Sequence, residues 1–328
     1  MVDIHAAETG AAHRPLPRLH SKLKAQRVRS AWLFVAPTLM VLALVAAWPL
    51  ARTIYLSFTN ASLGNFAETE FIGLQNYFAW STLNSGRTIF RGLLADPLWW
   101  NAVWNTLKFT VISVSFQTVL GLIIALALNL KFPGRGIVRA TILIPWALPG
   151  VVSAKMWTLI FNDQFGIFND ALMRLGLITQ KVAWLASSDT MMPVVLVVAV
   201  WMGTPFMAIL TLAALQSVPG DIYEAAKIDG VHPVKVFWRV TLPLIRPALM
   251  VAIIFRIMDA LRVFDLIYVM TPSSSETVTM SVLTQQYLFG FDRFGYGCAA
   301  STVLFLIVAF VIFVYIKVGR VTGEAGER

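Results

Sequence analysis

The sequence predicts an all-α protein, a polytopic bundle of six transmembrane helices with one short helix outside the membrane. Its 328 residues are 58% hydrophobic and only 13% charged, which is too apolar for a soluble domain. The apolar residues gather in uncharged runs of about 20, long enough to cross a bilayer. The net charge of +9 is scattered beside these runs rather than gathered on one polar domain, so we expect no nucleic-acid partner.

The N-terminal part is predicted to hold a tail, one span and one loop. Residues 1–30 are polar and basic and lack the apolar run of a signal peptide, which predicts a cytoplasmic tail. The uncharged run 31–51 predicts the first span, and residues 52–98 predict an external loop with some short helix. Indole rings favour the headgroup region of a bilayer. A membrane interface is therefore expected at Trp99, Trp100 and Trp104.

Five further spans follow from the remaining apolar runs. They are predicted at 109–130, about 140–161, within 190–220, 247–270 and 294–316. Pro145 and Pro149 predict an irregular backbone in the third span, which requires other protein segments to cover it. The membrane domain is thus 31–318, with a polar loop at 217–247 and a second tail at 319–328.

Lys and Arg are unevenly distributed between the two sides of the predicted bundle. Six spans place both termini on one side, and that side holds most of the basic residues outside the spans. Cytoplasmic segments carry this excess in membrane proteins. We therefore expect both termini and the 217–247 loop to be cytoplasmic.

The fifth predicted span differs from the others because it carries four charges. Their signs alternate and they recur at every third position, so successive members would be neighbours on a helix. Facing lipid, each would cost about 2.5–3.5 kcal/mol even on the lenient insertion scale. We expect the four side chains to face protein or water; they are Arg256, Asp259, Arg262 and Asp265.

The polar loop contains its own helix signals. Asp221 is predicted to cap a helix, Glu224 follows three residues later as in a capping box, and Gly230 is predicted to end it. Such a helix has about two turns and is roughly 12 Å long. His232 and Pro233 then start a second, amphipathic helix that is too polar to cross a bilayer.

This loop resembles the EAA loop of ABC importer permeases, whose pattern is EAAxxDGAxxxxxFxxxxLPxxxP. The matching residues are Glu224, Ala225, Ala226, Asp229, Gly230, Phe237, Leu242, Pro243 and Pro247, while Val231 stands where the family usually has Ala. The resemblance implies that the first helix docks into a cleft on a cytoplasmic ATPase subunit. The coupling residues would be Glu224, Ala225, Ala226, Asp229 and Gly230. The alternative is an ordinary cytoplasmic loop with a capped helix.

A weaker resemblance covers most of residues 31–318 and is to the maltose-type branch of carbohydrate permeases. It is carried by GLQNYF at 73–78, IPWALPG at 144–150, FGIFN at 165–169 and MDALRVFDLIYVMT at 258–271. After Thr271 the family commonly has a Gly-Gly-Pro turn, whereas this chain reads PSSSETVTMS. The resemblance implies a bacterial inner-membrane location, a second homologous permease, two ATPase subunits that bind ATP and Mg²⁺, and an extracytoplasmic sugar-binding protein.

A neutral sugar requires hydrogen-bonding groups in a cavity within the membrane. By position, the candidates to line or gate this path are Lys155, Asn162, Asp163, Arg256, Asp259, Arg262 and Asp265. The alternative for the four charges of span five is a structural ladder that pairs this span with its neighbours. Trp146, Trp157 and Trp201 could stack on sugar rings, although packing or lipid contact is the commoner role of such residues.

The sequence favours a subunit of a di- or oligosaccharide importer, with trehalose, maltose or sucrose-like α-glucosides expected first and a polyol or glycerol phosphate as the alternative. It contains no GxxxxGK[ST] pattern, so energy must come from a partner. No catalytic constellation or metal-ligand spacing is present, and we expect neither an enzyme nor a metal site. A secondary transporter remains a competing class and would depend on an ion gradient.

Overall fold

The computed structural model describes residues 19–82, 88–272 and 274–324. These residues form two compact units, which divide the chain at Arg52 and Thr53. The expectations for residues 1–18 and 325–328, which make up much of the two predicted tails, lie outside the described residues.

The first unit is helical along its described length. It contains α1 (Leu19–Leu42), the π-helical turn η1 (Ala43–Ala47) and the beginning of α2 (Trp48–Leu56). The stretch Gln26–Leu56 is long and apolar enough to span a membrane, in agreement with the predicted first span. Every side chain from 26 to 52 is exposed. A helix with so much apolar surface must be covered by lipid or by protein.

The second unit begins with a layer of short elements between α2 and the first long helix. Three single turns, η2 (Phe66–Glu68), η3 (Gly73–Asn76) and η4 (Leu93–Ala95), surround an antiparallel hairpin of β1 (Ala79–Thr82) and β2 (Thr88–Arg91). The sequence predicted short helix here but not the hairpin. Its strands have four residues each, too few for a recognisable alternation of apolar and polar positions.

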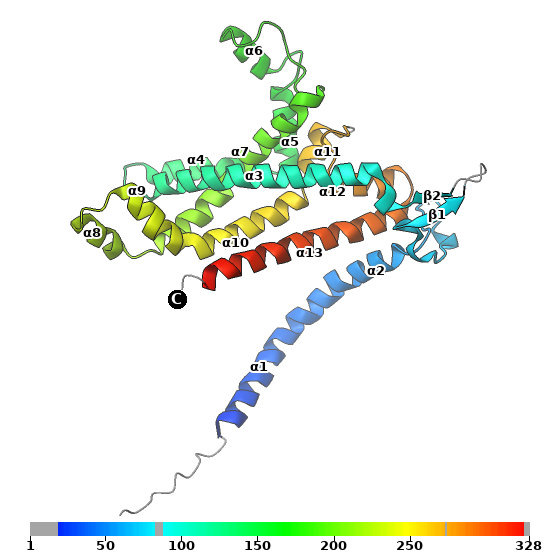
Figure 1. Cartoon of the computed structure of the whole chain (residues 1–328), viewed down its shortest axis with the longest axis horizontal. Helices are drawn as coiled ribbons and strands as arrows, with labels where there is room; N and C mark the ends of the chain where they lie inside the picture. Colours follow the sequence, from blue (N-terminus) through cyan, green and yellow to red (C-terminus); the bar gives the residue numbers. More distant parts are fainter. Residues whose placement is uncertain (1–18, 83–87, 273, 325–328) are drawn as a thin grey trace, which may run out of the picture. The chain divides into compact units, whose positions relative to one another are not determined.

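Four long helices form the body of this unit and run close together in Figure 1: α3 (Pro97–Asn129), α7 (Ser188–Gln216), α10 (Leu242–Leu261) and α13 (Phe294–Glu324). The α3 and α7 backbones pack closely at Gly121, where a Cβ atom would lie 2.6 Å from the Cβ of Met207. Small residues allow such close packing between membrane helices. Helix α3 begins before the predicted span because Asp96 caps it by accepting a bond from the Leu98 N–H.

The third predicted span is sharply broken. It forms α4 (Arg135–Ala147) and α5 (Gly150–Ile160), whose axes differ by 92°. The irregular backbone predicted for this span is confirmed at Pro149, whereas Pro145 lies within the regular helix α4, and the segment is not a straight crossing. Among the described residues, five helices could each cross a membrane, and the predicted total of six is reached only if the bent pair counts as one span.

Shorter elements complete the unit. They are α6 (Ile167–Arg174), α8 (Gly220–Ile228), α9 (Pro233–Val236), η5 (Phe237–Thr241), α11 (Asp265–Met270), α12 (Met280–Gln285) and η6 (Gln286–Gly290). In Figure 1, α8 and α9 lie at one end of α3, and the β1–β2 hairpin lies at the other.

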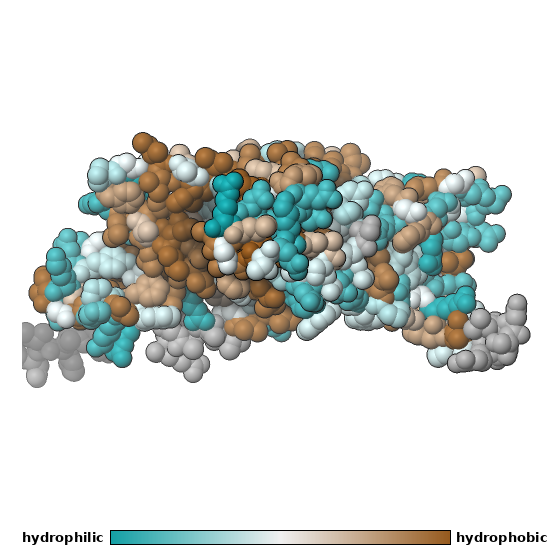
Figure 2. All heavy atoms as spheres, turned by 90° about the horizontal axis from the view of Figure 1, so that it is seen from above, coloured by the Kyte–Doolittle hydropathy of each residue, from teal (hydrophilic) through white to brown (hydrophobic). Residues whose placement is uncertain are grey.

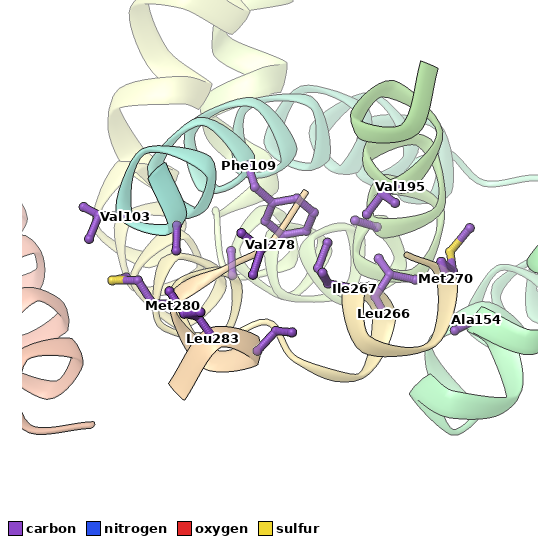
Figure 3. Close-up of a cluster of buried hydrophobic side chains, with 14 of the residues drawn as sticks. Val103, Phe109, Ala154, Val195, Leu266, Ile267, Met270, Val278, Met280 and Leu283 are labelled. Carbon is purple, nitrogen blue, oxygen red and sulfur yellow. The ribbon is translucent and has the colours of Figure 1, made fainter. Parts of the chain in front are cut away.

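The largest buried cluster gathers around the short helix α11 (Figure 3). Leu266 and Ile267 of α11 pack with Val195 of α7 and Phe109 of α3. Trp99 is completely buried in the same cluster, so its ring packs against protein and not against lipid headgroups. The side chains of Trp100 and Trp104 remain 51% and 60% exposed. On the outer surface, hydrophobic residues form broad areas beside hydrophilic groups (Figure 2).

Candidate functional sites

Helix α8 carries Glu224, Ala225 and Ala226, the first residues of the EAA pattern, and none of its side chains is buried. Glu224, Ala225, Asp229 and Gly230 are exposed, and Ala226 is partly buried. Asp221 does not cap the helix as predicted, because Pro219 occupies the N-cap position and Asp221 lies in the first turn. There its carboxylate still interacts favourably with the helix dipole.

Gly230 ends α8 as predicted. Its φ is +66°, in the left-handed region where glycine avoids the cost of a Cβ atom. The Gly230 N–H donates to the Lys227 carbonyl at 3.2 Å, and the Val231 N–H donates to the Ala226 carbonyl at 3.0 Å. These two bonds form a Schellman motif, which stops the helix and turns the chain away. A Cβ atom at Gly230 would meet nothing within 4 Å, so only the backbone conformation requires glycine.

The chain that follows joins this loop directly to the membrane body. His232 caps α9 by accepting a bond from the Val234 N–H at 3.3 Å. Helix α9, the π-helical turn η5 and α10 then continue without a non-helical residue up to Leu261. The second amphipathic helix and span five, which we predicted separately with the span beginning at Pro247, are therefore one helical run. Pro243 and Pro247 do not interrupt it. The π-helical turn η5, just before Leu242, adds one residue to the turn and so changes the pattern of backbone hydrogen bonds there.

A cavity of about 320 Å³ contains all four charged residues of span five. Gln117 of α3, Trp146 of α4 and Gly203 of α7 contribute to its lining. We call it the charged cavity. Its four charged residues are Arg256, Asp259, Arg262 and Asp265, so its formal charge is balanced.

Arg256 is the most constrained of these residues, with 12% of its side chain exposed. Its Nε donates to Gln117 Oε1 at 2.8 Å, and its Nη1 donates to Asp259 Oδ2 at 2.7 Å. The Gln117 amide in turn donates to the Ala199 carbonyl at 2.9 Å. A Cβ atom at Gly203 would lie 2.5 Å from Arg256 Nη2, so this glycine makes room for the guanidinium. The network links α10 to both α3 and α7.

The four charges of span five do not lie on one helix, so the expectation that successive members are helical neighbours is wrong beyond the first pair. Helix α10 ends at Leu261, and Arg262 is its C-cap. Arg262 donates from Nε to the Met258 carbonyl at 3.2 Å, and Asp265 starts the separate helix α11. Asp265 Oδ2 instead lies beside the N-terminal residue of α5, 3.1 Å from where a Cβ of Gly150 would be. Within the described segments, Arg256 and Asp259 form the only ion pair of this set.

The other three path candidates do not line the charged cavity. Asn162 accepts bonds from the Gln164 and Phe165 N–H groups at 2.9 and 3.1 Å, and so stabilises the turn after α5. Lys155 and Asp163 are exposed elsewhere. Of the tryptophans, Trp146 lines the cavity, while Trp157 and Trp201 pack against each other at 5.3 Å.

Sequence reasoning missed Gln117 and Gly203. Gln117 is 1% exposed and lies within the uncharged run 109–130. A buried amide needs a hydrogen-bond partner, so a glutamine in the middle of an apolar span was the available signal. Gly203 carried no comparable signal, because only the position of the Arg256 side chain shows why glycine is required there.

Comparison with known proteins gives matches along most of the chain. Residues 117–321 match the family described as binding-protein-dependent transport system inner membrane component. The trehalose/maltose transport system permease protein MalF of Thermococcus litoralis is 38% identical, over 92% of this chain and 97% of that protein. The sulfoquinovosyl glycerol transport system permease protein SmoG of Agrobacterium fabrum is 36% identical over 88% and 89%. The trehalose transport system permease protein SugA of Mycobacterium tuberculosis is 35% identical over 91% of each chain.

The fold is also similar to that of a solved structure. A chain of a bacterial ABC transporter involved in the import of the acidic polysaccharide alginate superimposes with a TM-score of 0.73. It is 21% identical, and the match covers 93% of this chain and 99% of that chain. At this identity the similarity establishes the architecture alone.

Proposed function

The chain belongs to the family of binding-protein-dependent transport system inner membrane components, and we propose that it forms the sugar path of an ATP-driven importer. The substrate is a di- or oligosaccharide, with trehalose, maltose and sucrose-like α-glucosides as first candidates. The chain is a multi-pass permease subunit and not an enzyme. In this proposal, ATP is hydrolysed by two ATPase subunits, and a second homologous permease completes the path.

The observation that carries this proposal is the exposed helix α8 at one end of the bundle. A two-turn helix with no buried side chain gains little stability from its own packing. Its C-terminal end is nevertheless fixed by the two hydrogen bonds of the Schellman motif. Such an uncovered helix with a defined end suits docking into a cleft on another protein, where Ala225 allows close approach and Glu224 offers a carboxylate to a basic residue. We assign coupling to Glu224, Ala225, Ala226, Asp229 and Gly230.

The helical run that follows α8 supplies a path for force. From Pro233 to Leu261 it is about 40 Å long at 1.5 Å per residue. Arg256 and Asp259 lie near its far end, in the charged cavity. A push on α8 would therefore move the cavity wall as part of a rigid body, which is how packed helices transmit movement. This supports alternating access driven by closure of the ATPase subunits.

The charged cavity favours a neutral substrate. Each arginine is matched by an aspartate, and the Arg256 guanidinium is already bonded to Asp259. An anionic substrate would have to displace this pair, whereas sugar hydroxyls can both donate to carboxylates and accept from guanidinium groups. The aromatic ring of Trp146 is 54% exposed and can stack on a sugar ring. Arg256, Asp259, Arg262 and Asp265 are therefore the path residues we retain.

An anionic substrate is the second candidate, because the relative from Agrobacterium fabrum is named for sulfoquinovosyl glycerol transport. Glycerol phosphate belongs to the same chemical class. Uptake by the whole transporter in proteoliposomes separates the candidates: unlabelled trehalose or maltose should compete with labelled trehalose, and glycerol phosphate should not. Uptake of labelled glycerol phosphate without uptake of labelled trehalose would reverse the assignment. Insensitivity to ionophores that dissipate proton and sodium gradients would exclude a secondary transporter driven by either gradient.

The coupling role is tested by reversing one charge. Glu224→Arg should lower ATP-driven uptake tenfold or more, because a lost charge-assisted hydrogen bond costs about 1.5–3 kcal/mol. Uptake and ATP hydrolysis are measured together in proteoliposomes that contain the complete transporter. The matched control is Glu276→Arg, an exposed residue on the far side of the predicted membrane. Equal uptake by the Glu224→Arg variant and the wild type would refute the coupling role.

A further inference from the structure

A second pocket lies away from the charged cavity, between η3, the β1–β2 hairpin and the first turn of α13. Its volume is about 640 Å³. Its lining includes Gln75, Trp80, Arg91, Arg293 and Tyr296. We call it the hairpin pocket. No residue of the charged cavity or of α8 contributes to it.

The hairpin pocket is positively charged. Arg91 and Arg293 both line it, and in the described part of the chain neither forms an ion pair. The Arg293 guanidinium is held 4.0 Å above the ring of Tyr296. The nearby carboxylate of Asp96 is already engaged, since it caps α3 and accepts from the Tyr287 hydroxyl at 2.5 Å. Two guanidinium groups thus remain available to an anion.

The wall of the pocket is preorganised. Asn76 is 9% exposed, and its amide donates to the carbonyls of Ser57 and Thr59 at 2.9 and 2.7 Å. Gly92 has a φ of +108°, and a Cβ atom there would lie 2.7 Å from the Tyr77 carbonyl oxygen. Only glycine allows the chain after β2 to approach η3 this closely. A preformed pocket avoids part of the entropy cost of binding.

The aromatic residues of the hairpin indicate a protein partner. Trp80 is 72% exposed, and its ring lies 5.2 Å from that of Phe90 on the neighbouring strand. The hairpin belongs to none of the candidate spans. Tryptophan, tyrosine and arginine are the residues most enriched among the energetic centres of protein interfaces. Here all three occur around one concave site.

The position of the pocket limits which partner can reach it. The hairpin and α8 lie at opposite ends of α3, a helix about 50 Å long at 1.5 Å per residue. If α8 meets the ATPase in the cytoplasm, the hairpin pocket faces outside; this step rests on the proposed function. We propose that the pocket receives a carboxylate-bearing loop of the extracytoplasmic sugar-binding protein, with Arg91 and Arg293 binding the carboxylate and Trp80 covering the apolar part of that loop.

The experiment measures binding of the trehalose-loaded binding protein of the same system to the complete transporter in nanodiscs. Arg91→Glu and Arg293→Glu should each weaken binding at least tenfold, mainly by slowing association, and their effects should shrink at high salt. Trp80→Ala should instead accelerate dissociation about tenfold. Arg174→Glu, an exposed arginine of another predicted outer loop, is the control and should bind like the wild type.

The outcomes separate this proposal from the proposed function. If the arginine variants bind and are stimulated in ATP hydrolysis like the wild type, the hairpin pocket is not the docking site, but the importer assignment stands. If the binding protein neither binds nor stimulates the wild type, the importer assignment itself fails. An effect of the variants that appears only in nanodiscs with anionic lipid, and vanishes in neutral lipid, would identify lipid headgroups as the occupant and overturn the proposal. Restoration of binding to Arg91→Glu by one Asp→Lys or Glu→Lys change on the binding protein would establish it.

Discussion

At the scale of single residues, Gly230 shows how one backbone conformation sets where α8 ends in the loop to which we assign coupling. Its positive φ costs an L-residue about 1–2 kcal/mol, while asparagine tolerates this region better. Gly230→Ala should therefore fray the end of α8 and reduce coupling between ATP hydrolysis and uptake, and Gly230→Asn should retain most of it. For both variants, the ratio of sugar taken up to ATP hydrolysed is measured in proteoliposomes.

Gly134 provides a matched control for that comparison. It also has a positive φ, +79°, and a Cβ atom there would meet nothing within 4 Å, but it lies before α4. Gly134→Ala carries a similar backbone cost without touching α8. If Gly134→Ala reduced coupling as much as Gly230→Ala, the loss in Gly230→Ala would be due to general destabilisation and not to fraying at the end of α8.

Asp292 is a second residue whose local contacts predict a measurable property. Its carboxylate accepts bonds from the Ser62 hydroxyl at 2.7 Å and the Leu63 N–H at 2.7 Å, and also binds the Gly64 N–H. The bond from Ser62, with those from the Leu63 and Gly64 backbone, lowers the pKa of Asp292. The charged form thus ties the segment after α2 to the segment before α13.

A lowered native pKa means that this stabilisation is complete above the unfolded-state pKa, about 3.9 for aspartate, and is lost as pH falls through the native value. We expect the wild type to have a higher Tm than Asp292→Asn at pH 5–8, with a constant difference. The difference should narrow only below about pH 4. A difference that changed between pH 5 and 8 would contradict the contacts described.

At the scale of elements, the contact between α3 and α10 separates structural from transport roles. Gln117 is buried and holds Arg256, whereas the Asp259 side chain is 68% exposed to the cavity. Gln117→Leu should lower the free energy of unfolding by about 1–3 kcal/mol, because it leaves a buried guanidinium N–H without its acceptor. Asp259→Asn should change Tm little but reduce trehalose uptake.

Melting curves in detergent and uptake in proteoliposomes measure the two effects. Thr118→Val is the control for Gln117→Leu, since the Thr118 hydroxyl bonds within α3 to the Val114 carbonyl. Restoration of uptake by the exchange of Arg256 and Asp259 would indicate that the pair is structural. Loss of uptake in both single variants and in the exchanged pair, with the Tm of each unchanged, would indicate direct contact with the sugar.

At the scale of the whole molecule, the orientation in the membrane can be tested with the single cysteine, Cys298, which is buried. In a Cys298→Ala background, Ser275→Cys should react with a membrane-impermeant maleimide on intact cells. Ala225→Cys should react only in inside-out vesicles freed of ATPase subunits. Both positions are exposed. The opposite labelling pattern would invert the chain and place α8 outside, contrary to the proposed coupling.

The sequence alone determined the class, the number of apolar runs and the EAA pattern of the 217–247 loop, because these follow from local properties. The length and apolar character of a run can be read without reference to any neighbour, although the 92° bend in the third span could not. The end of α8 at Gly230 depends on backbone conformation within a few residues. The EAA pattern is likewise contiguous, so its residues could be named before their positions were known.

The tertiary structure alone decided which polar groups meet. It showed that Arg256 bonds to Gln117, a residue 139 positions away, and that Asp265 lies beside Gly150. It also showed that the second loop helix and span five are one helical run. The hairpin pocket combines residues that precede α3 in the sequence with residues at the start of α13. Periodicity describes one element at a time, whereas a cavity is created by side chains from several elements, whose mutual positions are set by packing.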